Sequence, residues 1–307
     1  MIFAAWTPTK FDPRFRLLRA SADRFSITVR AIGCYSLTDK PQSLARFIQS
    51  LPEDETICVT DAFDVLYSGS QHQIEAQFAA LQQPILFGAE RLCSHHFAES
   101  RKHFEIQYPD SRYRYLNSGL IVGRVDALRE FLARQLSLDS PALEKRFEAE
   151  ESSGNFNDQS LFGFTAQHHP ELAGLDNHAE LLWNISGEWL DVHPFSQVQN
   201  GVVVNPFTGT TPSLLHIPYT LLYYPQLLLF AQAMNLNPSW HQISIRLLEQ
   251  SLDRTDRFHD SFPDGSALAT PSARLWQAAL SHFQRHKRRG VLLQRALARR
   301  LHIDGRV

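Results

Sequence analysis

Short apolar runs alternate with amphipathic stretches over the first two thirds of the chain. The runs Ile2–Trp6, Thr56–Thr60 and Leu116–Val122 have the length and composition of buried strands. Between them, apolar residues recur at helical spacing, as in Phe11–Ala22 and Asp39–Leu51. Strands that alternate with helices in this way predict an α/β fold built on one central sheet.

The same patterns predict the remaining elements of this part. Helices are expected at Gln71–Leu81, Asp126–Leu136 and Asn157–Gln167. Further strands are expected at Phe25–Ile32, Pro84–Phe87, Leu181–Ile185, Val202–Val204 and Leu214–His216. The segment Ser137–Asn155 contains Pro141, Gly154 and several glutamates, which predicts a loop.

The pattern changes near residue 222, after which apolar residues recur at helical spacing in longer blocks such as Leu227–Met234 and Trp240–Leu252. We therefore expect an α/β domain over residues 1–222 and a helical extension over residues 223–307 that packs on it. The last helix carries a row of basic residues: Arg285, Lys287, Arg288, Arg289, Arg295, Arg299 and Arg300. Such a helix is either solvated against the domain or in contact with an anionic membrane or a partner protein.

Charge and cysteine content exclude several classes of protein. Thirty Lys and Arg balance 32 Asp and Glu, and this formal net charge of -2 argues against a dedicated nucleic-acid binder. Three cysteines are too few for a disulfide framework. No run reaches the ~20 apolar residues of a membrane span, and Met1–Trp6 lacks the basic residue of a signal peptide. We expect a cytoplasmic globular protein.

Two aspartates follow the strand predicted at Thr56–Thr60. Asp61 and Asp64 lie on the turn that leaves this strand, and ligand sites of open α/β sheets form at the carboxyl ends of strands. Carboxylate oxygens placed there can bind a hard divalent cation such as Mn²⁺ or Mg²⁺. The alternative is an ordinary turn with one capping and one surface aspartate.

Three further polar segments lie at the ends of predicted elements. His216 ends a strand and is either a metal ligand or a hydrogen-bonded residue at the rim of the sheet. In Asn117–Gly119 the glycine lets a backbone approach a ligand, or the segment is a plain turn. Asn157 and Asp158 begin a helix, where they either cap it or present a carboxylate to a sugar hydroxyl.

Together and in this order, these segments resemble the glycosyltransferase domain of procollagen lysyl hydroxylases and, more distantly, the procollagen galactosyltransferases. The likeness runs from residue 1 to about residue 220. It is carried by Val59-Thr-Asp-Ala-Phe-Asp-Val-Leu-Tyr67, Ile85-Leu-Phe-Gly-Ala-Glu-Arg-Leu-Cys93, Tyr115-Leu-Asn-Ser-Gly-Leu-Ile-Val-Gly123, Asn157-Asp-Gln-Ser-Leu-Phe162 and Pro212-Ser-Leu-Leu-His216.

The resemblance implies a GT-A fold, a Rossmann-like sheet that binds a UDP-sugar with Mn²⁺ or Mg²⁺. By position, Asp61, Asp64 and His216 correspond to the metal ligands. Asp158 and Glu90 correspond to carboxylates near the reacting sugar or the acceptor, and they are the candidate catalytic residues. The positions implied around the nucleotide and the sugar are Trp6, Thr7, Thr9, Lys40, Phe63, Asn117, Ser118, Gly119 and Gln159.

The chain departs from the family pattern at two places around the nucleotide. The glycine-rich loop that precedes the lysine is shortened here to Cys34-Tyr-Ser-Leu-Thr-Asp-Lys40. The run after the metal histidine, which contains glycine and asparagine in the family, is replaced by Ile217-Pro-Tyr219. Helices, and no hydroxylase domain, follow the matching part, so the resemblance does not imply collagen modification.

The sequence thus predicts a metal-dependent glycosyltransferase that moves a hexose, glucose or galactose, from a UDP-sugar to a hydroxyl of a peptide, glycan or small molecule. A divalent ion stabilises the charge on the departing diphosphate, and Lys40 can assist. The acceptor either needs a carboxylate base or attacks on the side of the leaving group. The alternatives are a catalytically silent relative that uses the same surface for binding, and a metal-dependent phosphoesterase that uses Asp61 and Asp64.

Overall fold

The computed structural model of the chain describes most of its first 218 residues. The described residues are 1–8, 13–150, 152, 154–186, 192, 194–199, 201–218, 227, 230–231 and 233–236. The predicted helical extension over residues 223–307, with its basic helix, lies outside this part except for the last few described residues. The predicted boundary near residue 222 lies outside it as well.

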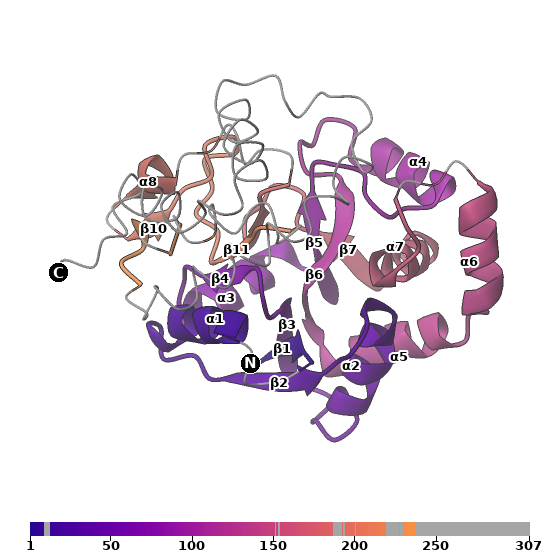
Figure 1. Cartoon of the computed structure of the whole chain (residues 1–307), viewed down its shortest axis with the longest axis horizontal. Coiled ribbons are helices and arrows are strands. Elements are labelled where there is room, and N and C mark those ends of the chain that lie inside the picture. The colour runs from indigo at the N-terminus through magenta and orange to yellow at the C-terminus, as the bar shows by residue number, and fades with distance from the viewer. Residues whose placement is uncertain are drawn as a thin grey trace, which may run out of the picture.

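A six-stranded mixed sheet forms the centre of the molecule (Figure 1). The strand order is β2 (Val29–Gly33), β1 (Ile2–Thr7), β3 (Thr56–Asp61), β6 (Tyr115–Arg124), β5 (Ile85–Glu90) and β7 (Ala173–Leu175). β1 pairs in parallel with β2 and β3, and β5 pairs in parallel with β7. β6 runs antiparallel to both β3 and β5. The α/β class predicted from the sequence is confirmed.

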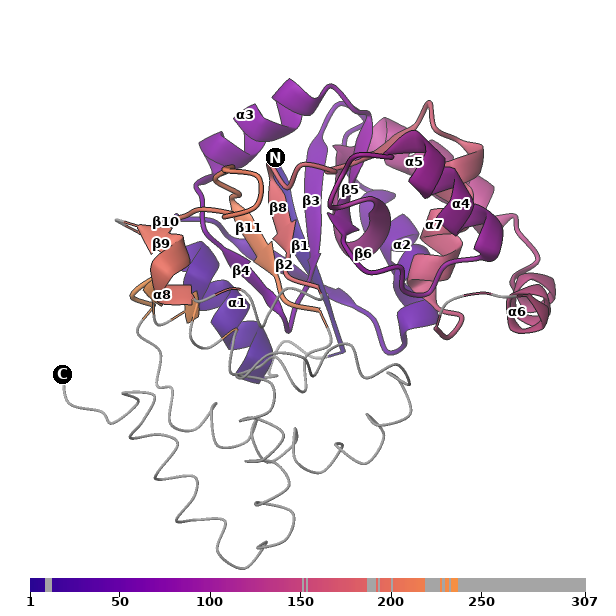
Figure 2. The same cartoon turned by 90° about the horizontal axis from the view of Figure 1, so that it is seen from above.

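Helices cover both faces of the central sheet. α1 (Pro13–Asp23) and α3 (Gln71–Leu81) lie on one side, whereas α2 (Lys40–Ile48), α5 (Val125–Leu136) and α7 (Asp158–His168) lie on the other (Figure 2). The helix predicted at Gln71–Leu81 is confirmed at both ends. Ser70 and Gln73 form a capping box at its N-terminus.

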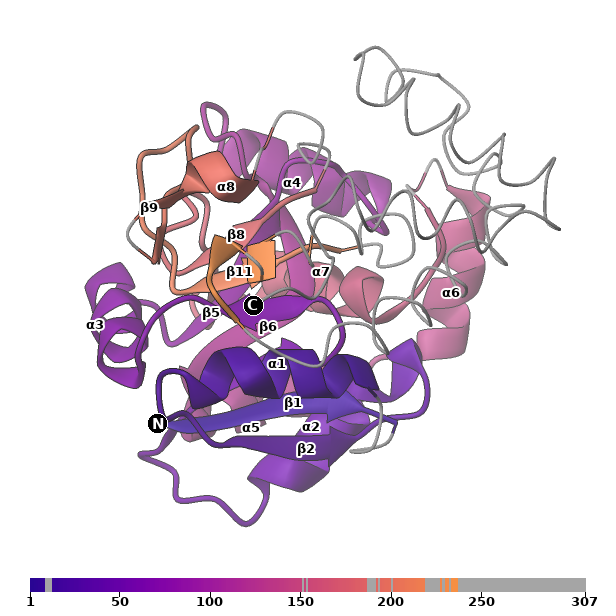
Figure 3. The same cartoon turned by 60° about the vertical axis from the view of Figure 1, so that its left-hand side comes forward.

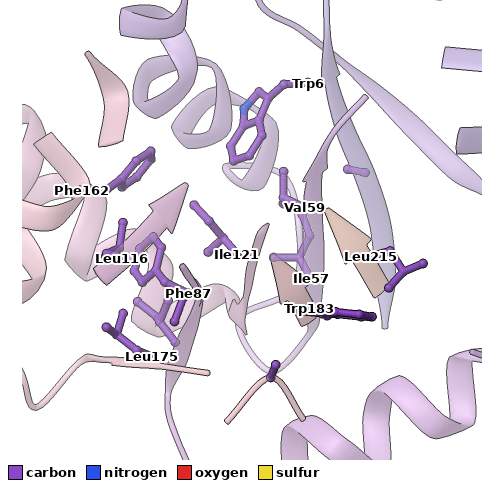
Figure 4. Close-up of a cluster of buried hydrophobic side chains, with 14 of the residues drawn as sticks. Trp6, Ile57, Val59, Phe87, Leu116, Ile121, Phe162, Leu175, Trp183 and Leu215 are labelled. Carbon is purple, nitrogen blue, oxygen red and sulfur yellow. The ribbon is translucent and has the colours of Figure 1, made fainter. Parts of the chain in front are cut away.

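Side chains of each strand alternate between two apolar clusters, one on each face of the sheet. In β1, Ala4 and Trp6 belong to one cluster, whereas Phe3 and Ala5 belong to the other. The cluster that includes Trp6 also contains Phe162 of α7 and spreads across the middle of the sheet (Figure 4). This two-sided burial fixes the register of the strands, since a shift by one residue would exchange their faces.

A smaller sheet brings together three segments that are far apart in the sequence. β11 (Leu214–His216) lies between β4 (Val65–Tyr67), which is antiparallel to it, and β8 (Leu182–Asn184), which is parallel (Figure 2). In this register His216 pairs with Val65 on one side and with Asn184 on the other. The end of β11 therefore lies beside Asp64, the residue before β4.

The remaining elements lie around this core. They are a 3-10 turn at Leu37–Asp39, α4 (Ala98–Gln107), α6 (Ser140–Ala149), α8 (Pro194–Gln197), β9 (Val198–Gln199) and β10 (Val202–Val203). None of the helices in the described ranges is long and apolar enough to cross a membrane.

The prediction of a loop over Ser137–Asn155 is wrong, because this segment contains the helix α6. The Asp139 side chain accepts a hydrogen bond from the backbone N–H of Ala142 at 3.0 Å and caps the helix. Phe147 is buried, with its ring centre 5.0 Å from that of Phe97. α6 lies at the outer edge of the molecule, beyond α7 (Figures 1 and 3). Its glutamates face water, which explains why its composition resembles that of a loop.

The strand predicted at Phe25–Ile32 begins later than expected. The backbone of Ser26 has a φ of 58°, in the left-handed region, and the N–H groups of Phe25 and Ser26 close a turn on the end of α1. β2 therefore begins only at Val29.

Asp176 holds the turn that leads into β8. Its buried carboxylate accepts hydrogen bonds from the backbone N–H groups of Glu180, Leu181 and Leu182, at 2.8, 2.8 and 2.7 Å. Burial raises the pKa of Asp176 to about 6, against the opposing effect of these N–H donors.

Replacing Asp176 with alanine is expected to lower the free energy of unfolding by about 3 kcal/mol or more, because each buried N–H left without an acceptor costs about 1–3 kcal/mol. Urea unfolding followed by circular dichroism measures the loss. Asp176→Asn keeps one acceptor oxygen and should lose less. An equal stability of Asp176→Ala and wild type would show that the turn does not depend on the carboxylate.

Candidate functional site

The end of β3 and the end of β11 place three potential metal ligands in one cluster. Asp61 is the last residue of β3, Asp64 precedes β4, and His216 ends β11. Each side chain offers one ligand atom, and these atoms all lie within 4.8 Å of one another. The structure thus brings together the three residues that the resemblance implied as metal ligands.

The His216 ring is buried and held on both sides. Its Nδ1 lies 2.6 Å from Asn184 Oδ1, and its Nε2 lies 3.5 Å from Asp64 Oδ2. Burial lowers the pKa of His216, but the negative charges of Asp64, Asp61 and Glu90 outweigh burial and leave this pKa above its ordinary value.

Two buried polar atoms of this cluster point to a ligand site. Within the described part of the chain, His216 Nε2 and Asp64 Oδ1 have no hydrogen-bond partner. Buried polar atoms are rarely left unpaired, so such atoms call for an explanation such as an ion. Two carboxylates and one imidazole are a suitable donor set for Mn²⁺. The residues present therefore fit a divalent cation of this kind.

Gly119 makes room for the His216 ring. A Cβ atom on Gly119 would lie 2.1 Å from His216 Cε1 and 2.6 Å from Nδ1, which is closer than any real contact. The place of Gly119 follows from the strand register, since Thr60 pairs with Leu120 and thus brings Gly119 beside Asp61. The absence of a side chain at Gly119 thus makes room for a side chain of this protein. The predicted approach of this glycine to a ligand stays a prediction.

The polar segment of β6 lies where the strand departs from regular pairing with β5. Phe87 pairs with Ile121, but the next residue, Gly88, pairs with Asn117. Residues 118–120 thus bulge out of the β5 register, and the Asn117 Oδ1 accepts a hydrogen bond from the Gly119 N–H at 2.9 Å. Such irregularities re-aim side chains and are common beside active sites.

Lys40 links the metal cluster to the start of α7. Its Nζ lies 2.7 Å from Asp61 Oδ1 and 3.0 Å from Asp158 Oδ2, and 5.1 Å from the ring centre of Trp6. Burial lowers the pKa of Lys40, but Asp158 and Asp61 more than compensate and hold this pKa well above its ordinary range. Lys40 is therefore a permanent buried cation between two carboxylates.

The start of α7 fixes Asp158 in position. Asn157 caps this helix, because its side chain accepts hydrogen bonds from the N–H groups of Gln159 and Ser160 at 2.9 and 3.3 Å. The capping role predicted for this segment is thus confirmed for Asn157. Asp158 is free to accept from the Ser118 hydroxyl at 2.7 Å, in addition to its contact with Lys40.

Glu90 forms the second buried carboxyl group of the site. Gln159 Nε2 donates to Glu90 Oε1 at 2.8 Å, and Gln159 Oε1 accepts from the Ser118 N–H at 3.2 Å. Burial raises the pKa of Glu90 to about 7, although Ser186, Gln159 and His216 oppose this rise. At neutral pH this group can therefore both give and take a proton.

The other predicted residues lie at the margin of this network. Thr7 is buried at the end of β1, and its carbonyl accepts from the Cys34 N–H at 3.2 Å. Phe63 is half-buried against the apolar cluster of α1 and α3. Thr9 lies outside the described residues, so its predicted place at the nucleotide stays a prediction.

Sequence reasoning missed Asn184, the partner of His216. This asparagine is completely buried and sits in the apolar segment Leu181–Ile185, which was expected only as a strand. A single amide side chain in an otherwise apolar strand is the sequence feature that could have indicated a role for Asn184. Its meaning depends on the pairing of β8 with β11, which the local sequence does not specify.

Part of this site lies in a segment that matches a family model. Residues 39–142 match the family model of the PLOD GT domain. Among solved structures, the apo crystal structure of mouse xyloside xylosyltransferase 1 matches with 14% identity and a TM-score of 0.42, covering 71% of this chain and 98% of that chain. No curated protein matches the chain. The match confirms the resemblance to the PLOD glycosyltransferase domain over residues 39–142, and the mixed sheet with helices on both faces confirms the predicted α/β class.

Proposed function

We propose that this protein is a metal-dependent glycosyltransferase that moves a hexose, glucose or galactose, from a UDP-sugar to a hydroxyl-bearing acceptor. The observation that carries the proposal is the cluster of Asp61, Asp64 and His216, whose ligand atoms lie within 4.8 Å of one another. The family match over residues 39–142 supports it, since that segment includes both aspartates and Lys40.

In this proposal Asp61, Asp64 and His216 hold Mn²⁺ or Mg²⁺. When bound there, such an ion neutralises the charge that builds up on the diphosphate of the donor as the glycosidic bond breaks. The chain positions these ligands at the end of β3, in the turn before β4 and at the end of β11. Rigid placement matters because groups already in position need not reorganise during the reaction.

Lys40 and Asp158 extend the site toward the sugar. Lys40 holds Asp61 and Asp158 at 2.7 and 3.0 Å, so the metal cluster and the candidate base keep a fixed separation. The cation also adds positive charge beside the proposed diphosphate position. The buried Trp6 ring packs against Lys40 on this side of the site.

Asp158 and Glu90 are the proposed proton-handling groups. Asp158 accepts hydrogen bonds and is held by Lys40 and Ser118, which suits a carboxylate that takes the proton of an acceptor hydroxyl. Glu90, with a pKa of about 7, is connected to the same place through Gln159. Ser118 and Gln159 connect the two groups by hydrogen bonds, and Asn117, Ser118 and Gln159 are the proposed contacts of the transferred sugar.

Calorimetric titration with UDP, in the presence of Mn²⁺ and again with EDTA, tests this function. Wild type is expected to bind UDP only with the metal, because the carboxylates would otherwise repel the diphosphate. Asp64→Ala should weaken metal-dependent binding by about tenfold or more, the lower end of the effect seen when groups that merely support a metal ligand are removed. Transfer from a panel of UDP-sugars to simple hydroxyl acceptors then identifies the donor.

Asp110→Ala is the matched control, since Asp110 is an exposed aspartate in the turn that follows α4. It should bind UDP like wild type. UDP binding by wild type that is equally strong in EDTA would refute metal dependence. Metal-dependent UDP binding without transfer from any UDP-sugar would instead identify a catalytically silent binding protein.

A further inference from the structure

We propose that Asn184 is a positioning residue that keeps His216 in one tautomer and one ring orientation, with Nε2 turned to the two aspartates. Its consequence for metal binding rests on the proposed function. The tautomer itself, however, is a property of the chain alone and is measurable without any metal.

The contact between the two side chains is built into the sheet. Asn184 and His216 are direct neighbours in the parallel pairing of β8 with β11. Asn184 Oδ1 lies 2.6 Å from His216 Nδ1, and both side chains are almost completely buried. Water therefore does not compete for this hydrogen bond, and the geometry of the two strands holds the atoms in place.

A second hydrogen bond decides which end of the Asn184 amide faces the histidine. Asn184 Nδ2 donates to the carbonyl oxygen of Ala89 at 2.8 Å. Because a carbonyl can only accept, the NH₂ group must point to Ala89 and the amide oxygen must point to His216. The amide oxygen also can only accept, so it requires a hydrogen on His216 Nδ1.

The neutral His216 ring then has its free electron pair on Nε2. This nitrogen is the atom that lies 3.5 Å from Asp64 Oδ2 and has no hydrogen-bond partner among the described residues. A histidine binds a metal through a nitrogen without hydrogen, and the hydrogen bond of the other nitrogen selects the tautomer. Asn184 thus prepares His216 for a cation beside Asp61 and Asp64.

Glycines leave room for this arrangement on two strands. A Cβ atom on Gly88 of β5 would lie 3.0 Å from Asn184 Nδ2 and 2.5 Å from a methyl group of Leu182. On β6, Gly119 leaves the space that the His216 ring occupies. The pair Asn184–His216 therefore packs against β5 and β6 at two positions where these strands lack a side chain.

The tautomer is measured by ¹⁵N NMR on protein labelled at histidine, without metal and at a pH above the raised pKa of His216. The chain has 14 histidines, so the His216 signals are assigned by their loss in His216→Gln. Wild type is expected to carry the hydrogen on Nδ1. A wild-type hydrogen on Nε2 would overturn the proposal, and this measurement needs no variant of Asn184.

Three variants test the role of Asn184. Asn184→Ala removes the acceptor and should move the tautomer equilibrium away from Nδ1–H. Asn184→Asp keeps an acceptor oxygen and should retain the wild-type tautomer. Asn205→Ala is the matched control, because Asn205 is also fully buried but bonds to Tyr113. An unchanged tautomer in Asn184→Ala would overturn the assignment.

Mn²⁺ titration of the same proteins gives a second readout. Asn184→Ala should bind Mn²⁺ about 10- to 100-fold more weakly than wild type, the usual effect of removing the partner of a metal-bound histidine. Asn205→Ala should bind it unchanged. Equal Mn²⁺ affinity of Asn184→Ala and wild type would overturn the positioning role. If wild type itself bound no Mn²⁺ but showed Nδ1–H, the proposed function would fail while the tautomer assignment stood.

Discussion

Replacing Lys40 with methionine is expected to lower the free energy of unfolding by about 3–5 kcal/mol, the usual cost of removing one partner of a buried ion pair. Lys40 neutralises Asp158 and Asp61, at 3.0 and 2.7 Å from its Nζ. The Asp158 side chain is almost completely buried, with 3% of its surface exposed, so water cannot replace the lost cation. Methionine fills a similar volume, which leaves the unpaired charge as the main cause of the loss.

Urea unfolding at several pH values checks this cause. Because the Lys40 pKa lies well above its ordinary range, the wild-type cation stays charged through neutral pH. Lys40→Met has no such cation at any pH. A pKa that is raised in the folded state means that the cation contributes fully to stability below the ordinary lysine pKa of 10.5 and that this contribution is lost as the pH rises further. The stability difference between variant and wild type should therefore be fully present at neutral pH and shrink only in strongly alkaline solution.

Two further variants separate charge from packing. Lys40→Met combined with Asp158→Asn removes both charges and should recover part of the lost stability, since the two effects are coupled. Lys102→Met, at an exposed lysine of α4, should change stability by no more than about 0.5 kcal/mol. A Lys40→Met protein as stable as wild type at pH 7 would show that Lys40 does not stabilise these carboxylates.

The elements that the sequence predicts well are those with a strong local pattern. The helix at Gln71–Leu81 has its own capping box, and the apolar runs at β1, β3 and β6 are long enough to be distinguished from loops. The missed elements lack such patterns. β4 and β7 have three residues each and form because distant strands pair with them, whereas β8 and β11, which are equally short, were predicted from their apolar runs.

The helices α4 and α6 were missed because their sequences are mostly polar. α4 and α6 bury few of their side chains, Ser100 and Phe104 in α4 and Phe147 in α6. Their sequences therefore lack the broad apolar stripe that identifies a helix packed on a core. In α6 the cap at Asp139 and the pair Arg146–Glu150, at 2.6 Å, are the local causes of helix formation.

The residues of the candidate site differ in how far the sequence predicts them. Asp61 and Asp64 follow a clear strand, so their place at the sheet edge could be predicted from the residues alone. For His216 the residues alone left a metal ligand and a residue at the rim of the sheet as alternatives, and only the family resemblance favoured the ligand, because the pairing of β11 with β4 is not visible in the local sequence. Asn184 could not be predicted at all, since its role depends on two hydrogen bonds between strands that are distant in the sequence.

Gly119→Ala is expected to reduce Mn²⁺ affinity and sugar transfer by about a hundredfold or more. The new Cβ would lie 2.1 Å from His216 Cε1, 2.6 Å from Nδ1 and 2.7 Å from Nε2, so the whole ring must move. That movement breaks the contacts with Asn184 and with Asp64 together. Losing the support of a metal-bound histidine alone costs up to about a hundredfold, and here the ligand itself is displaced.

Mn²⁺ titration and a transfer assay measure these losses, and unfolding experiments identify their cause. Overpacking alone should lower the stability of Gly119→Ala by about 1–3 kcal/mol. Adding His216→Ala removes the ring, so the double variant should regain stability but not Mn²⁺ binding. This recovery distinguishes a collision with His216 from general damage to β6, because damage to the strand would persist without the ring.

Gly33→Ala is the control for adding a methyl group to a strand. Gly33 ends β2, and a Cβ there meets nothing within 4 Å, so this variant should keep Mn²⁺ affinity and stability. Normal Mn²⁺ binding by Gly119→Ala would show that the His216 ring is not needed where the structure places it. If such a variant still lost sugar transfer, the hypothesis that Gly119 lets a sugar approach the backbone would be supported, because the methyl group would then obstruct only the ligand.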